Sequence, residues 1–219
     1  MATTVQSPKK TRRQIQKEET RSIILKSAYK LFADHGYEKT TMRELAKDSG
    51  IALGTAFKHF PDKSSLLTAA FEEDIQKVLE QAIGSLPDRD IYLQLRHLVR
   101  AIYNFYAKDP ALSRALVKEA LFIDGPAGDI IKVQAMRFLT GVGNLLQEAV
   151  ERGEIQPIET VLDAATGFWS FYLLGIITGL SEPQFNVEQQ VAFVDKLLKK
   201  HFPKMDNHIE SNDEAAGSV

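Results

Sequence analysis

Apolar residues recur at helical spacing along almost the whole chain, and short breaker segments separate the stretches that carry this pattern. The separators include Gly50-Ile51-Ala52, Asp109-Pro110 and Glu182-Pro183, which contain residues that end helices and form turns. We find no convincing strand, repeat or heptad array. The pattern therefore predicts an all-α fold of about nine helices.

Four helices are expected in the N-terminal third of the chain. The first covers residues 15–35 and is closed by Gly36. The second begins at Thr41, which stands three residues before Glu44 in a capping-box arrangement, and the third is a short helix over 53–59. Asp62 is a suitable N-cap for a long fourth helix. The later helices are expected at about 88–107, 111–123, 127–152, 158–180 and 187–202.

Charge is distributed unevenly along the 219 residues, although the formal net charge is only −2. Residues 1–63 hold 13 Lys and Arg against 7 Asp and Glu, whereas the remainder holds 14 against 22. A basic region of this kind favours a polyanionic partner such as nucleic acid.

Several classes of function are disfavoured by what the sequence lacks. There is no cysteine, which excludes disulfides and thiolate chemistry and fits a reducing cytoplasm. The first 20 residues do not resemble a secretory signal, so we expect a cytoplasmic protein. HExxH and GxSxG motifs are absent, and we expect no catalytic site, metal or cofactor.

Residues 20–70 resemble the helix-turn-helix region of the TetR family of transcriptional regulators. The matching residues are Phe32-Ala33, Gly36-Tyr37, Thr40-Thr41-Met42-Arg43, Leu45-Ala46, Gly50-Ile51, Gly54-Thr55, Phe57, His59-Phe60, Lys63 and Leu66-Leu67. Beyond residue 70, only the number and length of the helices agree with the family.

The resemblance implies a ligand-responsive regulator, a repressor, that binds palindromic operator DNA as a homodimer and is released by a small-molecule effector. It implies a flexible basic arm (1–17), a three-helix DNA-binding domain (18–63), a helical effector-binding and dimerisation domain (64–202) and a disordered tail (203–219). The arm carries the basic residues Lys9, Lys10, Arg12, Arg13 and Lys17.

A helix that enters the major groove needs small residues at its start and side chains with polar tips beyond them. Helix N-termini and exposed basic residues supply contacts to phosphates. Ala56 and Phe60 are expected to face inward and pack the recognition helix on the first two helices. The predicted DNA-binding residues are Thr41, Arg43, Leu53, Gly54, Thr55, Phe57, Lys58, His59 and Lys63.

Two residues depart from the usual family pattern. Ala52 stands where a serine commonly caps the recognition helix, and Phe57 stands where tyrosine is frequent. These departures leave open a second hypothesis, in which the chain is a helical small-molecule binding protein with a degenerate DNA-binding region. A third hypothesis, an all-helical hydrolase or oxygenase, would require a metal or demonstrable turnover.

Residues 164–181 form an uncharged segment whose length approaches that of a membrane-spanning helix. Its acidic flanks and the absence of basic anchors favour a buried packing helix with no membrane partner. The resemblance implies that this helix and the last one form a dimer interface. The alternative, in which these helices form a core within a single chain, also remains. The predicted interface residues are Phe171, Gly175, Thr178, Gly179, Val191, Val194 and Leu198.

The C-terminal region is rich in aromatic residues with a few polar neighbours, a composition that suits a small-molecule pocket. Aromatic residues also dominate ordinary cores, so many of these side chains are equally compatible with plain packing. The predicted ligand-binding residues are Tyr103, Tyr106, Phe122, Gln134, Arg137, Phe138, Trp169 and Tyr172.

Overall fold

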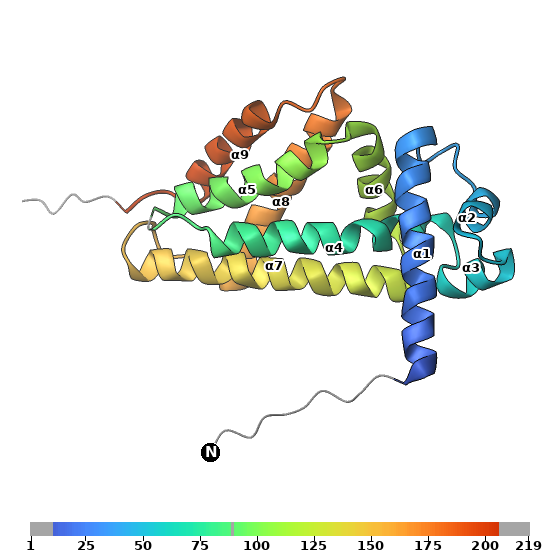
Figure 1. Cartoon of the computed structure of the whole chain (residues 1–219). Helices are drawn as coiled ribbons and strands as arrows, with labels where there is room; N and C mark the ends of the chain where they lie inside the picture. The colour runs from blue at the N-terminus through green and yellow to red at the C-terminus, as the bar shows by residue number, and fades with distance from the viewer. Residues whose placement is uncertain (1–10, 89, 206–219) are drawn as a thin grey trace, which may run out of the picture.

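The computed structural model describes residues 11–88 and 90–205. Within these residues the chain forms nine helices, and the only β-type pairing is an isolated bridge between Ile155 and Lys204. The all-α prediction is confirmed (Figure 1). The helices are α1 (Arg12–His35), α2 (Met42–Ser49), α3 (Leu53–His59), α4 (Lys63–Gly84), α5 (Ile91–Ala107), α6 (Pro110–Phe122), α7 (Gly125–Glu151), α8 (Val161–Ser181) and α9 (Val187–His201).

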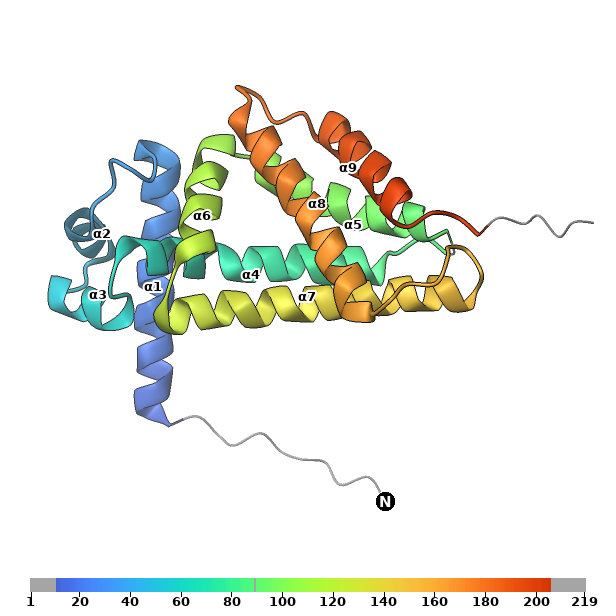
Figure 2. The ribbon, with the colours of Figure 1, turned by 180° about the vertical axis from the view of Figure 1, so that it is seen from behind.

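The helices form a small head, α1 to α3, at one end of a longer body, α4 to α9 (Figures 1 and 2). Helices α4 and α7 run along the length of the body, and α1 crosses their ends, with α2 and α3 on its far side. Helix α4 packs against α1 as well as against α5, α6 and α7. It is therefore the element that connects the head to the interior of the body.

The helix starts follow from side-chain capping. Thr41 Oγ1 accepts a hydrogen bond from the Glu44 amide at 3.2 Å, and the Glu44 carboxylate accepts one from the Thr41 amide at 2.8 Å. The predicted capping box is thus confirmed. The predicted Asp62 cap is confirmed as well, because its carboxylate accepts from the Ser65 amide at 2.6 Å.

The first helix begins earlier than expected, at Arg12. Thr11 and Gln14 form a capping box that the sequence analysis overlooked, and no breaker follows it before His35. The predicted flexible arm over residues 1–17 is therefore wrong for residues 12–17, which are helical and exposed. The part of the arm at residues 1–10, with Lys9 and Lys10, lies outside the described residues.

Two further boundaries differ from the expectations. Helices α6 and α7 begin at Pro110 and Gly125, earlier than the expected residues 111 and 127. Proline fits the first turn of a helix, because its missing N–H is not needed there. Residues 203–205 are not disordered, because Gln156 donates to the Pro203 carbonyl at 2.9 Å and Met205 donates to the Glu154 carbonyl at 3.3 Å. The predicted tail at 206–219 lies outside the described residues.

Candidate DNA-binding head and effector cavity

The turn between α2 and α3 sets the direction of the recognition helix. Gly50 ends α2 in the left-handed conformation, with φ 68° and ψ 16°, which glycine adopts without strain. Ile51 donates to the Ala46 carbonyl at 3.1 Å, which closes the turn and redirects the chain into α3. The two helices thus form a compact helix-turn-helix on the outer side of α1 (Figure 1).

Helix α3 has one buried and one exposed face. Ala56 and Phe60 are buried against the rest of the head, as the sequence predicts. Gly54, Phe57 and Lys58 are exposed, and the Phe57 side chain remains 44% accessible. We call these three residues the outer face of α3. An exposed aromatic ring, a cation and a glycine on one short helix provide a surface that backbone and bases of a duplex could contact closely.

The start of α3 lacks a side-chain cap. Ala52 occupies the N-cap position and makes no side-chain hydrogen bond, as its identity requires. The first amides of α3 are therefore free of any side-chain acceptor within the described residues. They are available to an external acceptor such as a phosphate oxygen.

Helix α1 adds basic groups beside α3. The pKa of His59 lies below its usual value because of partial burial first and of the nearby charges of Lys17 and Arg21 second. The Arg21 guanidinium lies 5.1 Å from the centre of the Phe60 ring. Sequence reasoning placed Lys17 in a flexible arm and missed Arg21, although their spacing of four residues puts both on one side of a helix.

The remaining predicted head residues are placed differently from one another. Arg43 is exposed on the first turn of α2, and Thr55, His59 and Leu53 are part-buried in α3. The Thr41 hydroxyl is already used, because it donates to the Glu44 carboxylate at 2.9 Å.

Lys63 requires a correction of its predicted role. Its ammonium donates to the Tyr37 carbonyl at 2.8 Å and to the Glu38 carbonyl at 3.3 Å, and it lies 4.1 Å from the centre of the Tyr37 ring. These contacts hold the start of α4 against the loop between α1 and α2. The side chain therefore stabilises the head instead of extending toward a phosphate.

Residues 24–70 match the sequence profile of the bacterial regulatory proteins of the tetR family. This segment is similar to the DNA-binding region of TetR-family transcriptional regulators. The matched segment covers the second half of α1, the helix-turn-helix and the start of α4. It lies within residues 20–70, the region whose sequence resembles this family.

Two relatives extend the similarity into the body. The chain is 24% identical to the HTH-type transcriptional repressor KstR of Rhodococcus jostii (strain RHA1) over 166 residues, which cover 75% of this chain and 74% of that protein. It is 27% identical to the HTH-type transcriptional regulator SrpR of Pseudomonas putida over 187 residues, or 84% of each protein.

Among solved structures, the fold is similar to that of the transcriptional regulator FadR from Bacillus subtilis in complex with stearoyl-CoA. The TM-score is 0.64 at 18% sequence identity, and the match covers 81% of this chain and 97% of that one. The predicted division of the TetR fold into a helix-turn-helix head and a helical body is confirmed.

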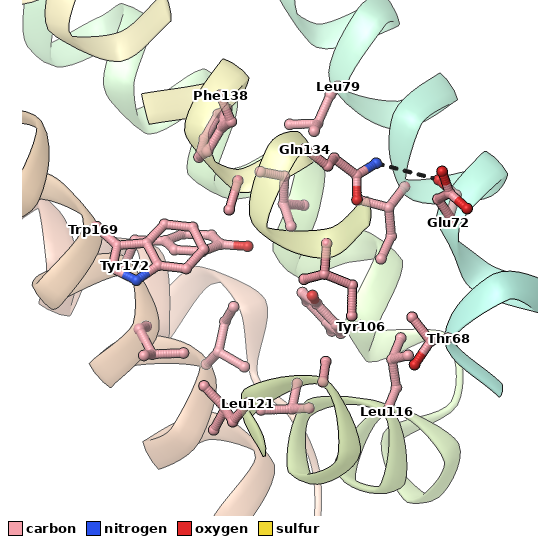
Figure 3. A pocket seen from close by; sticks show the side chains of 18 residues that line it. Thr68, Glu72, Leu79, Tyr106, Leu116, Leu121, Gln134, Phe138, Trp169 and Tyr172 are labelled. Carbon is pink, nitrogen blue, oxygen red and sulfur yellow. Dashed lines mark hydrogen bonds between the residues drawn. The ribbon is translucent and has the colours of Figure 1, made fainter. Parts of the chain in front are cut away.

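The body contains a cavity of about 150 Å³ between α4, α5, α6, α7 and α8 (Figure 3). Its walls are mainly aliphatic and aromatic. The predicted residues that line it are Tyr106, Gln134, Phe138, Trp169 and Tyr172.

Three predicted ligand-binding residues do not line this cavity. Phe122 is 84% exposed at the end of α6, where its neighbour Leu121 faces the cavity instead. Arg137 is exposed on α7 and is not among the residues that line the cavity. Tyr103 is fully buried, and its hydroxyl donates to the Tyr172 carbonyl at 2.7 Å, so it packs behind the cavity wall.

Helix α4 contributes two polar lining residues that the sequence analysis missed. Thr68 is only 5% exposed, and its hydroxyl has no hydrogen-bond partner among the described residues. Glu72, one turn later, lies at the α4 edge of the cavity, and its backbone carbonyl accepts from Gln134 Nε2 at 3.3 Å (Figure 3). Ile75 and Leu79 follow on the same face, a spacing of four and three residues that could have identified it.

Two tyrosine hydroxyls complete the polar groups of the cavity. Burial raises the pKa of Tyr106 to about 12. Burial also raises the pKa of Tyr172 well above its usual value, and its hydrogen bond to Tyr106 acts in the same direction. Both phenols are therefore neutral at physiological pH.

Most predicted dimer-interface residues lie inside the single chain. Val191, Val194 and Leu198 are buried by packing of α9 on α5 and α8. A Cβ atom on Gly175 would lie 2.1 Å from Tyr103 Oη, and one on Gly179 would lie 2.8 Å from the Phe185 ring. These residues cannot contact a second subunit in this arrangement, because neighbouring helices of the same chain already cover them.

The other two predicted interface residues, Phe171 and Thr178, are part-buried. Phe171 packs against His201, with 5.4 Å between ring centres, and Thr178 donates to Gln190 Oε1 at 3.0 Å. They also make contacts within the chain.

A different apolar surface is exposed on α8 and α9. Leu174 and Ile177 of α8 are 42% and 44% exposed, and Phe193 of α9 is 37% exposed. We call these residues the α8–α9 outer face. Helix α8 is long and apolar enough to cross a membrane by length and composition, but it packs on α7 and α9, and its inward face belongs to the core.

Proposed function

We propose that the chain is a dimeric repressor that binds a palindromic operator through α3 and releases it when a small molecule enters the cavity of the body. The observation that carries this proposal is the position of α4. It begins four residues after the end of α3, and its middle turns form one wall of the cavity. A ligand that displaces α4 therefore displaces the head.

Hydrogen bonds at two points along α4 support this coupling. The Tyr29 hydroxyl of α1 donates to the Asp74 carboxylate of α4 at 2.6 Å and is also close to the Ala70 carbonyl. Ser64, at the start of α4, donates to the Glu119 carboxylate of α6. Because hydrogen bonds tie α4 to both α1 and α6, a shift of α4 relative to α6 changes the orientation of the head.

The DNA-binding part of the proposal is tested with a fluorescent duplex from the region beside the chain's own gene. We expect specific binding that weakens steeply with salt, because the basic head displaces counterions from phosphates. Lys58→Ala should relax sequence preference, by about 1–3 kcal/mol at the affected base pair, whereas Lys132→Ala on the exposed side of α7 should change nothing. A DNA affinity that does not change with salt concentration would contradict the proposal.

The dimer is proposed to form through the α8–α9 outer face instead of through the buried residues first predicted. Two recognition helices need a twofold arrangement to read a palindrome. Ile177→Glu should convert the protein to a monomer in sedimentation experiments, while Ile83→Glu, at a comparably exposed residue of α4, should leave the dimer intact. Equal assembly of both variants would reject this interface.

A helical small-molecule carrier with an inactive head remains the second candidate, because Ala52 leaves α3 without a cap. Under that hypothesis the purified protein binds ligand but no fragment of its own upstream region. We further propose that the regulator is cytoplasmic, has no membrane or cofactor requirement and catalyses no reaction. Turnover or a stoichiometric metal in the purified protein would refute the last statement.

A further inference from the structure

The cavity has one formally charged lining residue among those the structure describes, and that residue is Glu72. No lysine, arginine or histidine occurs among the lining residues described. We propose that the effector is a compact organic cation, an amine with a single apolar ring or a body of similar size, whose ammonium group pairs with the Glu72 carboxylate. This inference rests on the proposed function, because it specifies the ligand of the same cavity.

The size of the cavity limits the apolar part of the ligand. A cavity of about 150 Å³ accommodates a group close to one benzene ring. Leu121 and Glu72 lie at its edge and are not fully buried, so a short polar extension can reach solvent there. A long acyl chain does not fit without rearrangement of α6 or α7.

The negative charge of Glu72 determines which sign of charge the ligand can carry. The Glu72 carboxylate has no hydrogen-bond or ion-pair partner within the described part of the chain. A carboxylate ligand would place a second negative charge beside it in a partly desolvated site, with no basic side chain in the wall to compensate. An ammonium group instead gains an ion pair and a charge-assisted hydrogen bond.

The aromatic wall favours the same class of ligand. Trp169 and Tyr172 lie with their ring centres 5.3 Å apart, and Phe138 lies 5.9 Å from Tyr172. The faces of such rings attract cations, most strongly where water is excluded. Thr68 adds a buried hydroxyl that still lacks a partner and can accept or donate a hydrogen bond to the ligand.

The test compares three probes of nearly the same size and different charge: phenethylamine, 2-phenylethanol and phenylacetate. Calorimetric titration of the full chain at pH 7.5 should give at least a tenfold higher affinity for the amine than for phenylacetate. In Glu72→Gln, the amine should lose about tenfold in affinity and its advantage over the alcohol, as expected for one lost charge pair. The matched control is Glu73→Gln, which removes an exposed carboxylate paired with Lys77 at 2.7 Å.

Thr68→Val tests the second contact. It should weaken the amine and the alcohol by a similar factor, because it removes a hydroxyl without changing charge. Wild-type affinity of each variant for the DNA duplex, measured without effector, confirms that the variant is folded. Equal binding of phenylacetate, an unchanged amine-to-alcohol ratio in Glu72→Gln, or no binding of any probe would each overturn the inference.

The proposed function is tested separately, by measuring whether each probe releases the labelled duplex from the protein. If phenethylamine binds in a Glu72-dependent manner but leaves DNA binding unchanged, the ligand class stands and ligand-controlled release fails. If the duplex is released only by phenylacetate, release stands and the cationic class fails.

Discussion

Replacing Gly175 by alanine places a methyl group in a position that the chain already fills. The new Cβ would lie 2.1 Å from Tyr103 Oη, 3.0 Å from Tyr103 Cζ and 2.7 Å from Val194 Cγ2. The Tyr103 ring cannot swing aside easily, because it is fully buried and lies between Tyr172 and Phe185, with ring-centre distances of 5.9 and 5.6 Å. Its hydroxyl is also held by the Tyr172 carbonyl at 2.7 Å.

The expected change in stability combines three contributions. Overpacking of a well-filled core costs about 1–3 kcal/mol. Loss of the Tyr103 hydrogen bond costs about 1 kcal/mol more. The higher helix propensity of alanine offsets up to about 1 kcal/mol. We therefore expect a net loss of about 2 kcal/mol in the free energy of unfolding and a melting temperature lower by roughly 4–8 °C.

Urea unfolding at fixed protein concentration measures this change, with Gly141→Ala as the matched control. Gly141 lies within α7 with open space around its Cβ position, so its replacement should stabilise the protein by about 0.5–1 kcal/mol. A cycle with Tyr103→Phe should show coupling, because removal of the hydroxyl relieves part of the clash. Gly175→Ala as stable as Gly141→Ala, or an absence of coupling, would refute this reasoning.

Three further outcomes are expected in the head. Ala52→Ser should supply the missing cap of α3 and raise the unfolding free energy by about 1 kcal/mol in urea titrations; no gain would show that the first amides of α3 are already satisfied. The pKa of His59 is lower in the folded protein than in the unfolded chain. Its contribution to the free energy of unfolding is therefore present above the unfolded-state pKa, and it is lost as the pH falls through that pKa and then through the folded-state pKa. Between pH 7.5 and 5.0, the wild type should therefore lose more thermal stability than His59→Gln, and equal losses would contradict the shift. Lys63→Met should lower the melting temperature, because two loop carbonyls lose their donor, and unchanged melting would remove its stabilising role.

The head was predictable because its determinants are local in sequence. The Thr41 capping box and the left-handed Gly50 stand at the two ends of α2. Helix capping and turn formation depend on only a few residues that are close in sequence. The role of Lys63 could not be predicted in the same way, since its partners lie about 25 residues earlier in the chain. A basic residue near a DNA-binding motif has the same sequence signature whether it contacts phosphate or backbone carbonyls.

The cavity was less predictable, because five helices contribute to it and small rotations decide which side chains enter. Adjacent residues of a helix point about 100° apart, so Leu121 lines the cavity while Phe122 is exposed. The spacing of Thr68, Glu72 and Ile75 places them on one face of α4, but it gives no indication that this face meets an empty volume. That information depends on the distance between helices, which composition does not specify.

The uncharged segment of α8 shows the same limit for assembly. Apolarity around a helix requires covering on every side, yet it does not say which chain covers each side. In the structure, one side of α8 is covered by the same chain and another is not. Gly175 faces Tyr103 and Val194, whereas Leu174 and Ile177 remain exposed. Gly175→Ala and Ile177→Glu should therefore affect different properties, the first the stability of the subunit and the second its association. If Gly175→Ala instead produced folded monomers, the glycine would lie at the subunit interface, and the packing of α8 against α5 and α9 would have to differ from that described.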